Sequence, residues 1–354
     1  MNHMQTATGD ERLKLAGDWA LRTVGGKHGA RMSIPGDVHS ALIEAGIIAH
    51  PYEWRNEEKV QWVAQEDWIV SRDFDMPDVF APDMPRSLAP EGWYLDIDYL
   101  DTVAEVSVNG VTVLEARNCF RRYRPDVSHV LKPGRNRIEI LFHSNPKAAN
   151  ALQASMPFPV PYAAQNCPIP NGNMLRKPAC HFGWDWNIAL APFGVYGDVR
   201  LVVDNRLRFH SPVIQQVHEA GLVTVHVTTW LFGDGSNQDC DVTLTCAGVT
   251  AQQKARHGKV SLEVTIEDPA LWWPAGQGAQ VLHDLTLSCG EAVWTGRIGF
   301  RDLQLVTEKD AVGTGFKFRA NGRDVFAKGA NWIPADALDS NITPEATRAL
   351  LQSA

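Results

Sequence analysis

The sequence lacks the long apolar runs and the leading segment that would direct a chain into or across a membrane. None of its 354 residues belongs to a run approaching the roughly 18 consecutive apolar residues that span a bilayer. The polar start, Met1 to Arg12, has no apolar core followed by small residues, so no signal peptide is recognised. We therefore expect a cytoplasmic protein with no membrane partner.

Cysteine pairs and excess positive charge are also missing. The six cysteines are scattered, with no C-x-x-C and no Cys/His pair at zinc spacing, so we expect reduced thiols and no metal site. No glycine-rich phosphate loop is present, and no cofactor is expected. Acidic residues outnumber basic ones, 41 to 33, for a net charge of −8. That balance argues against a nucleic-acid partner.

Strand patterns dominate what is present. Ala104, Val106 and Val108 alternate with polar residues and are followed by Asn109-Gly110, a typical two-residue hairpin turn. Similar alternating runs occur at residues 94–99, 137–142 and 198–203. This pattern predicts an antiparallel sandwich or jelly roll.

Two segments interrupt the strands. A helix is predicted over Val38 to Ile47, with Asp37 as its N-cap. From Pro146 to Cys180 the regular pattern fails, and a loop of this length inside a domain is usually functional or disordered.

The pattern changes twice in the second half of the chain. After Asn205 the strands are shorter and evenly spaced, which suggests an immunoglobulin-like sandwich. The expected strands there are 222–230, 241–246, 260–266 and 283–289.

The last part of the chain predicts a strand at 325–327 and a helix with Thr343 as N-cap and Pro344 as its first residue. One strand followed by one helix is the first unit of an α/β fold and cannot bury its own faces. The chain therefore looks truncated, and we expect Phe326 and Trp332 to remain in an apolar patch.

The segment Cys180–Trp186 holds the candidate binding residues. Asp185 lies between Trp184 and Trp186, with His181 nearby. Indole faces cover the apolar patch of a pyranose, and a carboxylate accepts hydrogen bonds from its hydroxyls. The alternative is that both indoles are core anchors and Asp185 a turn residue. His181 is a candidate for a direct contact or for bracing the loop.

Other aromatic and acidic residues favour structural roles. Trp54, Trp62 and Trp68 are typical of packing between sheets rather than of an exposed sugar platform. Glu57 and Glu58 are adjacent carboxylates, which we expect at a solvated or salt-bridged surface.

Four ordered segments resemble the N-terminal portion of β-mannosidases of glycoside hydrolase family 2. Within this family, Trp184-Asp185-Trp186 and the segment ending in Ile333-Pro334 resemble the β-mannosidase branch more than the β-galactosidase or β-glucuronidase branches. The four segments are Ile34–His39 with Asp67-Trp68, Leu100–Ala104 running into Val108–Gly110 and Asn118–Tyr123, His181–Trp186, and Lys328–Pro334.

The resemblance implies a mainly β chain with three parts. These would be a jelly-roll (galactose-binding-like) sugar-binding domain, an immunoglobulin-like β-sandwich, and the first βα unit of a truncated (β/α)8 barrel, over 1–205, 206–308 and 309–354. It implies retaining hydrolysis of terminal β-mannosides. It also implies that Trp184 and Asp185 contact the non-reducing mannose, and that Asn331 and Trp332 end the first barrel strand on the active face.

This sequence departs from the family in two ways. Asn187-Ile188 follows the second Trp where many members have Gly-Pro. The two catalytic glutamates belong to later barrel strands, past Ala354, so no catalytic residue is assigned and the isolated chain is expected to be inactive. The expected partners are a β-mannoside or manno-oligosaccharide and the missing barrel domain. A stand-alone carbohydrate-binding module and a same-family hydrolase of other glycosides, such as β-galactosides, β-glucuronides or β-glucosaminides, remain alternatives.

Overall fold

The structure, a computed structural model, describes residues 10–76, 92–203, 207–233, 236 and 239–354. The described residues form two units, each treated by itself. The first unit combines 10–203 with 332–354, and the second unit is 207–331. The boundary expected at residues 205 and 206 lies outside the described residues, as does most of the segment in which a signal peptide was sought. None of the described helices has the length and apolar character needed to cross a bilayer.

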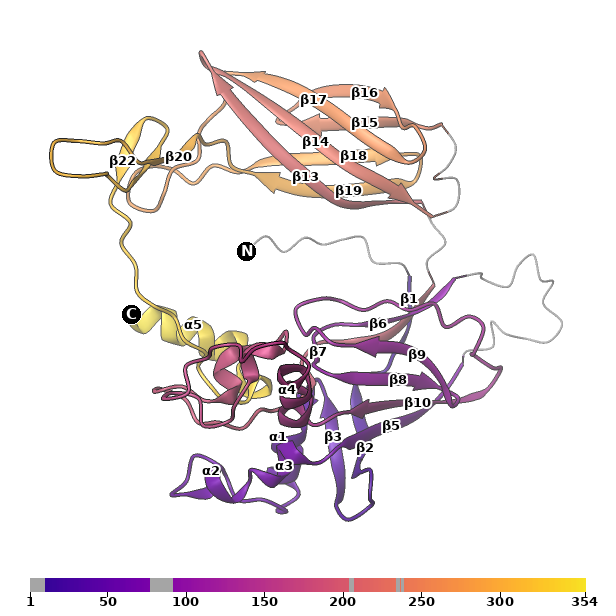
Figure 1. Cartoon of the computed structure of the whole chain (residues 1–354). Helices are drawn as coiled ribbons and strands as arrows, with labels where there is room; N and C mark the ends of the chain where they lie inside the picture. The colour runs from indigo at the N-terminus through magenta and orange to yellow at the C-terminus, as the bar shows by residue number, and fades with distance from the viewer. Residues whose placement is uncertain (1–9, 77–91, 204–206, 234–235, 237–238) are drawn as a thin grey trace. The chain divides into compact units, whose positions relative to one another are not determined.

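A six-stranded antiparallel sheet is the main layer of the first unit, in the order β3-β2-β5-β10-β8-β9 (Figure 1). Two three-stranded antiparallel sheets, β1-β12-β6 and β4-β11-β7, complete the unit. The strands are β1 (Asp10–Lys14), β2 (Gly17–Thr23), β3 (Gly29–Ile34), β4 (Gly36–Asp37), β5 (Trp68–Asp75), β6 (Trp93–Ile97), β7 (Leu100–Asp101), β8 (Ala104–Val108), β9 (Val111–Ala116), β10 (Arg135–Phe142), β11 (Gly194–Val195) and β12 (Val199–Val203).

The predicted hairpin is confirmed. β8 pairs with β9, and its residues alternate between buried and partly buried positions. Asn109 and Gly110 connect the strands with φ of 53° and 81°, the left-handed conformation that this turn requires. The alternating runs predicted near 94–99, 137–142 and 198–203 correspond to β6, β10 and β12.

One hydrophobic core lies between these sheets. Trp19, Trp68 and Trp93 are among its largest fully buried side chains, and they come from different strands. Burial of such side chains is the main favourable term in folding. Trp62 packs partly buried against this core. The prediction that Trp54 also packs between sheets is wrong, because its side chain is 97% exposed.

Short helices cover one edge of the first unit. They are α1 (Val38–Glu44), α2 (Asn56–Lys59), α3 (Trp62–Gln65), α4 (Asn145–Ala154), η2 (Gly172–Met174) and η3 (Ala179–Phe182). Asp37 caps α1 as predicted, since its side chain accepts from Ser40 N. The expected absence of regular structure from Pro146 to Cys180 is wrong in its first part. There Ser144 caps α4, and Pro146 occupies the first turn, where a missing N–H costs nothing.

The second unit contains two antiparallel sheets over one hydrophobic core. Their orders are β13-β14-β17 and β16-β15-β18-β19. The strands are β13 (Arg208–Glu219), β14 (Leu222–Phe232), β15 (Asp241–Cys246), β16 (Val249–Lys254), β17 (Lys259–Glu267), β18 (His283–Cys289) and β19 (Ala292–Ile298). The four strands predicted here are confirmed as β14, β15, β17 and β18. The two antiparallel sheets confirm a mainly β second unit, and its immunoglobulin-like identity stays a prediction.

A small antiparallel sheet, β20-β21-β22, also belongs to the second unit. Its strands are β20 (Leu303–Val306), β21 (Lys317–Ala320) and β22 (Arg323–Val325). The strand expected at 325–327 ends at Val325 and pairs antiparallel with β21, so the structure does not show a barrel strand here. Phe326, just after it, is 83% exposed.

The end of the chain returns to the first unit. It contains η4 (Asp339–Asn341) and α5 (Pro344–Ser353). The prediction for the start of this helix is confirmed, because Thr343 caps it by accepting from Ala346 N and Pro344 is its first residue. No residue of α5 is buried.

Candidate functional site

The Trp-Asp-Trp segment lies on a surface loop of the first unit. η3 leads to Gly183, whose φ of 101° strains any residue with a side chain. A Cβ atom there would lie 2.5 Å from Cδ of Pro168, so the turn requires glycine. After it, Trp184 and Trp186 are 37% and 39% exposed, and Asp185 is exposed. The alternative that both indoles are core anchors is therefore wrong.

The exposed segment has the chemistry of a sugar contact. An indole that is partly packed and partly exposed presents an apolar face to a ligand at little entropic cost. The carboxylate of Asp185 accepts hydrogen bonds and has no protein donor among the described hydrogen bonds. Its two indole neighbours and this acceptor lie within one short turn, which the backbone bridge between Trp184 and Asn187 closes.

Backbone hydrogen bonds close the base of this loop. The carbonyl of His181 accepts from Leu190 N at 3.2 Å and from Ala191 N at 2.7 Å. The Asn187 side chain donates to the carbonyl of Cys180 at 3.0 Å. His181 thus joins the two ends of the loop through its main chain.

A second support comes from helix α2 and from Gln61, the residue that precedes helix α3. Ala189 N donates to Glu57 Oε1 at 2.7 Å, and Gln61 Nε2 donates to the Ala189 carbonyl at 2.7 Å. Glu58 pairs with Arg55 at the surface, as expected. Glu57 has a role that the sequence did not indicate, because it holds the backbone of the candidate loop.

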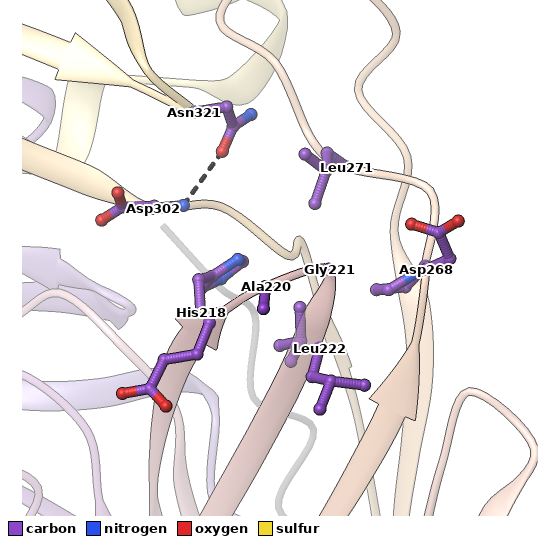
Figure 2. A pocket seen from close by; sticks show the side chains of 11 residues that line it. His218, Ala220, Gly221, Leu222, Asp268, Leu271, Asp302 and Asn321 are labelled. Atoms are coloured by element: carbon purple, nitrogen blue, oxygen red, sulfur yellow. Dashed lines mark hydrogen bonds between the residues drawn. The ribbon is translucent and has the colours of Figure 1, made fainter.

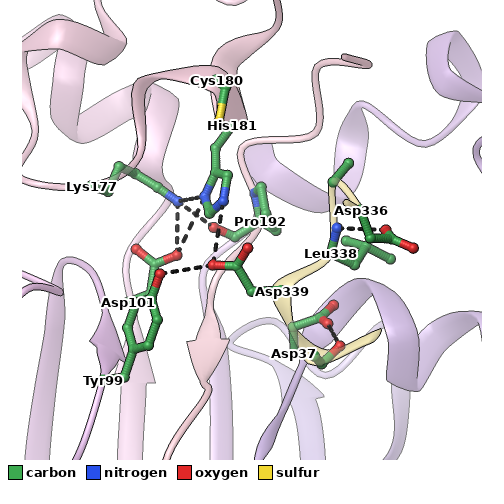
Figure 3. A network of polar contacts seen from close by, with 12 residues as sticks. Asp37, Tyr99, Asp101, Lys177, Cys180, His181, Pro192, Asp336, Leu338 and Asp339 are labelled. Atoms are coloured by element: carbon green, nitrogen blue, oxygen red, sulfur yellow. Dashed lines mark hydrogen bonds and ion pairs between the residues drawn. The ribbon is translucent and has the colours of Figure 1, made fainter. Parts of the chain in front are cut away.

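The side chain of His181 enters a buried polar cluster (Figure 3). Lys177 Nζ lies at its centre, 2.9 Å from Asp101 Oδ2, 2.9 Å from His181 Nδ1 and 2.7 Å from the Pro192 carbonyl. The side chains of Lys177 and Asp101 are fully buried. A buried charge is tolerated only when it is paired and hydrogen-bonded, and all three ammonium hydrogens have acceptors here.

Asp339 reaches the same cluster from the end of the chain. Tyr99 donates from its hydroxyl to Asp339 Oδ2 at 2.8 Å, and His181 Nε2 lies 3.6 Å from the same oxygen. Burial raises the pKa of Asp339, but its contacts with the His181 ring and the Tyr99 hydroxyl and the positive charge of Lys177 outweigh burial, so the net pKa is lowered. Burial and the Asp339 charge raise the pKa of Tyr99, which remains a donor.

The residues around Asp339 are also anchored to the first unit. Ala337 and Leu338 are buried in its core. Ser340 donates to Asp37 Oδ2, the same carboxylate that caps α1. Burial raises the pKa of Asp37, although its hydrogen bonds to Ser340 and Ser40 act in the opposite direction.

The structure places the five predicted site residues unevenly. Trp184, Asp185 and His181 share one loop, with His181 buried at its base. Trp332 is 56% exposed and belongs to the first unit, whereas Asn331 is exposed and belongs to the second. Contact of any of the five with a sugar stays a prediction.

Sequence reasoning missed Asp101, Lys177, Tyr99 and Asp339. The Lys177–Asp101 pair joins residues 76 positions apart, and Tyr99 and Asp339 are 240 positions apart, so no local pattern indicates either contact. One signal was available, because Asp101 lies inside a segment that carried the family resemblance.

The cluster does not have the access that a catalytic pair needs. Asp101 and Asp339 lie on opposite sides of the His181 ring, at 3.7 Å and 3.6 Å from its two nitrogens. Glycoside hydrolysis requires both carboxyl groups to reach the glycosidic bond. The Asp101 side chain is fully buried, so we assign the cluster a structural role.

The second unit has an open pocket of about 270 Å³ (Figure 2). His218, Asp268, Asp302 and Asn321 are among the residues that line it. Asn321 accepts from Asp302 N and donates to the Trp272 carbonyl, so it fastens the neighbouring chain segments. Burial lowers the pKa of His218, while the charge of Asp302 opposes this. The pocket shows no arrangement that indicates a reaction.

Comparison with known proteins gives a consistent result. Residues 19–197 match the family described as "Glycosyl hydrolase 2 galactose-binding domain-like". The β-mannosidase of Capra hircus is 30% identical over 96% of this chain and 40% of its own length. The crystal structure of a β-D-mannosidase from Dictyoglomus thermophilum matches with a TM-score of 0.83 and 29% identity, over 96% of this chain and 42% of that one.

A more distant match shows the fold alone. The exo-chitosanase of Amycolatopsis orientalis matches with a TM-score of 0.64 and 18% identity, over 96% of this chain and 39% of that one. The chain thus spans about 40% of the length of the curated relatives it matches.

Proposed function

Because this chain belongs to the galactose-binding domain-like family of glycosyl hydrolase 2, we propose that it is the N-terminal, non-catalytic part of a retaining, exo-acting β-mannosidase. In this role it supplies one wall of the pocket for a terminal, non-reducing β-D-mannose residue. The observation that carries the proposal is the similarity of 96% of the chain to proteins named β-mannosidase.

The exposed loop supports a sugar contact. Trp184 and Trp186 leave part of each indole accessible on either side of the Asp185 carboxylate. A pyranose stacks its apolar face on an indole and donates hydroxyl hydrogens to a carboxylate. We assign mannose contact to Trp184 and Asp185. Sugar contact by Asn331 and Trp332 stays a prediction.

The reaction itself is assigned to a barrel domain of the same protein. Retaining hydrolysis needs two carboxyl groups about 5–5.5 Å apart, one as nucleophile and one as acid and base. Asp185 alone binds but cannot perform both steps. The proposed partners of this chain are therefore that barrel and a β-mannoside or manno-oligosaccharide.

Mannosides are favoured over other glycosides by the degree of similarity. The matches named β-mannosidase in Capra hircus and Dictyoglomus thermophilum are 30% and 29% identical to this chain, whereas the exo-chitosanase is 18% identical and indicates only the fold. A β-glucosaminide, β-galactoside or β-glucuronide hydrolase is the alternative within the family. The cytoplasmic location expected from the sequence stays a prediction.

Turnover by the isolated chain tests the non-catalytic assignment. Purified residues 1–354 are expected to release no aryl alcohol from an aryl β-mannoside above a blank without protein. A parallel preparation carrying Asp185→Ala controls for contaminating glycosidases, because a contaminant would be equally active in both. Turnover that is present in the native chain and lost in the variant would overturn the assignment.

A stand-alone binding module is the second candidate, and the exposed indoles on both sides of Asp185 favour it. Calorimetric titration with manno-oligosaccharides separates the two functions. Tight binding that is lost in Asp185→Ala would indicate a complete module. Absence of binding by the native chain is the result expected of a half-site.

A further inference from the structure

We propose that His181, Lys177 and Asp339 are positioning residues that fasten the loop bearing Trp184 and Asp185 to the chain segment after Trp332. The cluster would hold two parts of the proposed mannose wall, which are distant in sequence, against the same buried anchor. Its importance for sugar binding rests on the proposed function, but the fastening itself does not.

His181 connects the loop to the cluster because its main chain and side chain act in different places. Its carbonyl accepts from Leu190 N and Ala191 N and so closes the loop that carries Trp184 and Asp185. Its ring lies in the buried cluster, 99% shielded from solvent along with the Lys177 and Asp101 side chains. Displacement of the ring would therefore displace the His181 carbonyl, which joins the start of the loop to Leu190 and Ala191 at its end.

Lys177 fixes the orientation of the His181 ring. An ammonium group has only donors, so the ring nitrogen 2.9 Å from Lys177 Nζ, Nδ1, acts as the acceptor. The ring proton is then on Nε2, which faces Asp339 Oδ2 at 3.6 Å. Lys177 in turn is held by Asp101 and by the Pro192 carbonyl. These contacts therefore direct the Nε2–H group of His181, at the base of the loop, toward Asp339.

Asp339 brings the second segment to the same point. Its carboxylate accepts from Tyr99, and the adjacent Leu338 is fully buried in the core. Ser340 is tied to Asp37 and lies 3.0 Å from the Ser40 hydroxyl. The segment is therefore fixed on both sides of Asp339, and the loop gains a rigid acceptor rather than a mobile one.

The buried Nε2 makes the contact with Asp339 consequential. This nitrogen has no hydrogen-bond partner within 3.5 Å among the described residues, and the Asp339 carboxylate is the acceptor that faces it. Without that carboxylate, a donor would remain in a dry site with no acceptor, which destabilises the local arrangement. Relaxation is expected at the loop base, because His181 is also the residue that closes it.

Hydrogen exchange of backbone amides in the whole chain tests the fastening. Asp339→Asn removes the negative charge but keeps an acceptor oxygen. It is expected to speed exchange about tenfold in a peptide containing the Leu190 and Ala191 amides, since a neutral acceptor in place of a charged one weakens the contacts with Tyr99 and His181 by up to about one power of ten. The matched control is Asp336→Asn, the same charge change in the same segment. Asp336 contacts only Leu338 N and Asn341 among the described hydrogen bonds, so the loop peptide should be unaffected.

Two further variants keep the test decisive. Tyr99→Phe removes one hydrogen bond from Asp339 and is expected to change the same peptide in the same direction by a smaller factor. His181→Ala should speed exchange in both the loop peptide and the peptide covering 336–343. Amides of β10 act as the internal reference, because a positioning role leaves them unchanged.

Two results would overturn the inference. The first is faster exchange in 336–343 with an unchanged loop peptide in Asp339→Asn, which would show that the segment and the loop are held independently. The second is a uniform increase that includes β10, which would show a purely global effect on stability. Failure of the proposed function is a separate result, namely that Trp184→Ala and Asp185→Ala leave β-mannoside binding by the longer natural protein unchanged.

Discussion

Replacement of Lys177 by methionine should destabilise the first unit strongly. Methionine fills a similar volume but removes the ammonium group that donates to Asp101, His181 and the Pro192 carbonyl. The Asp101 carboxylate would then be buried without its cation. Breaking a buried ion pair from one side typically costs about 3–5 kcal/mol. For a unit of roughly 200 residues this corresponds to a fall of about 6–20 °C in Tm.

Calorimetry on the native chain, Lys177→Met and two further variants measures this cost. Lys147→Met, at an exposed position of α4, is the matched control and should remain within about 0.5 kcal/mol of the native chain. The double variant Asp101→Asn with Lys177→Met should be more stable than the sum of the single effects predicts, because the unpaired charge is gone. A Lys177→Met transition as stable as that of the control would refute the reasoning.

The remaining predictions concern the loop turn and the acid side of the stability profile. Gly183→Ala should lower the free energy of unfolding in urea by about 1–3 kcal/mol, because it combines a positive φ with a clash against Pro168. Gly110→Ala also has a positive φ but has open space around it, so it should lower this free energy less. Equal losses in the two variants would contradict this reasoning. The pKa of Asp339 is lowered by folding, so its stabilisation is present above the ordinary value near 3.8 and lost as pH falls through the folded pKa. The stability difference between the native chain and Asp339→Asn should therefore shrink on acidification below about pH 4. The pKa of Asp37 is raised by burial, so the stability of Asp37→Asn relative to the native chain should increase as pH rises above 3.8. If the relative stabilities of Asp339→Asn and Asp37→Asn changed in the same direction with pH, these assignments would be contradicted.

Local patterns predicted much of the fold. Alternation in β8 and the Asn109-Gly110 turn gave a hairpin because both signals are contained in neighbouring residues. The helix caps Asp37 and Thr343 were predicted for the same reason. The sequence pattern does not indicate helix α4, because proline and asparagine near its start are typical of loops, although the first turn of a helix accepts them.

The candidate site was only partly predictable. Trp184 and Asp185 stand out by residue type and spacing, but their exposure depends on packing that one segment does not specify. The cluster around Lys177 was invisible, because its pairs form only after sheets and loops from distant segments meet. A buried lysine is rare, so composition alone would place it at the surface.

Hydrolysis of an aryl β-mannoside by the natural protein that contains this chain tests the central claim most directly. Asp185→Ala is compared with Asp75→Ala, which removes an exposed carboxylate at the end of β5. A charged hydrogen bond to the bound sugar is worth about 1.5–3 kcal/mol, which is roughly a 10- to 150-fold loss in kcat/KM. The account predicts such a loss in Asp185→Ala and native activity in Asp75→Ala. Equal kcat/KM values in the native protein and Asp185→Ala would contradict it.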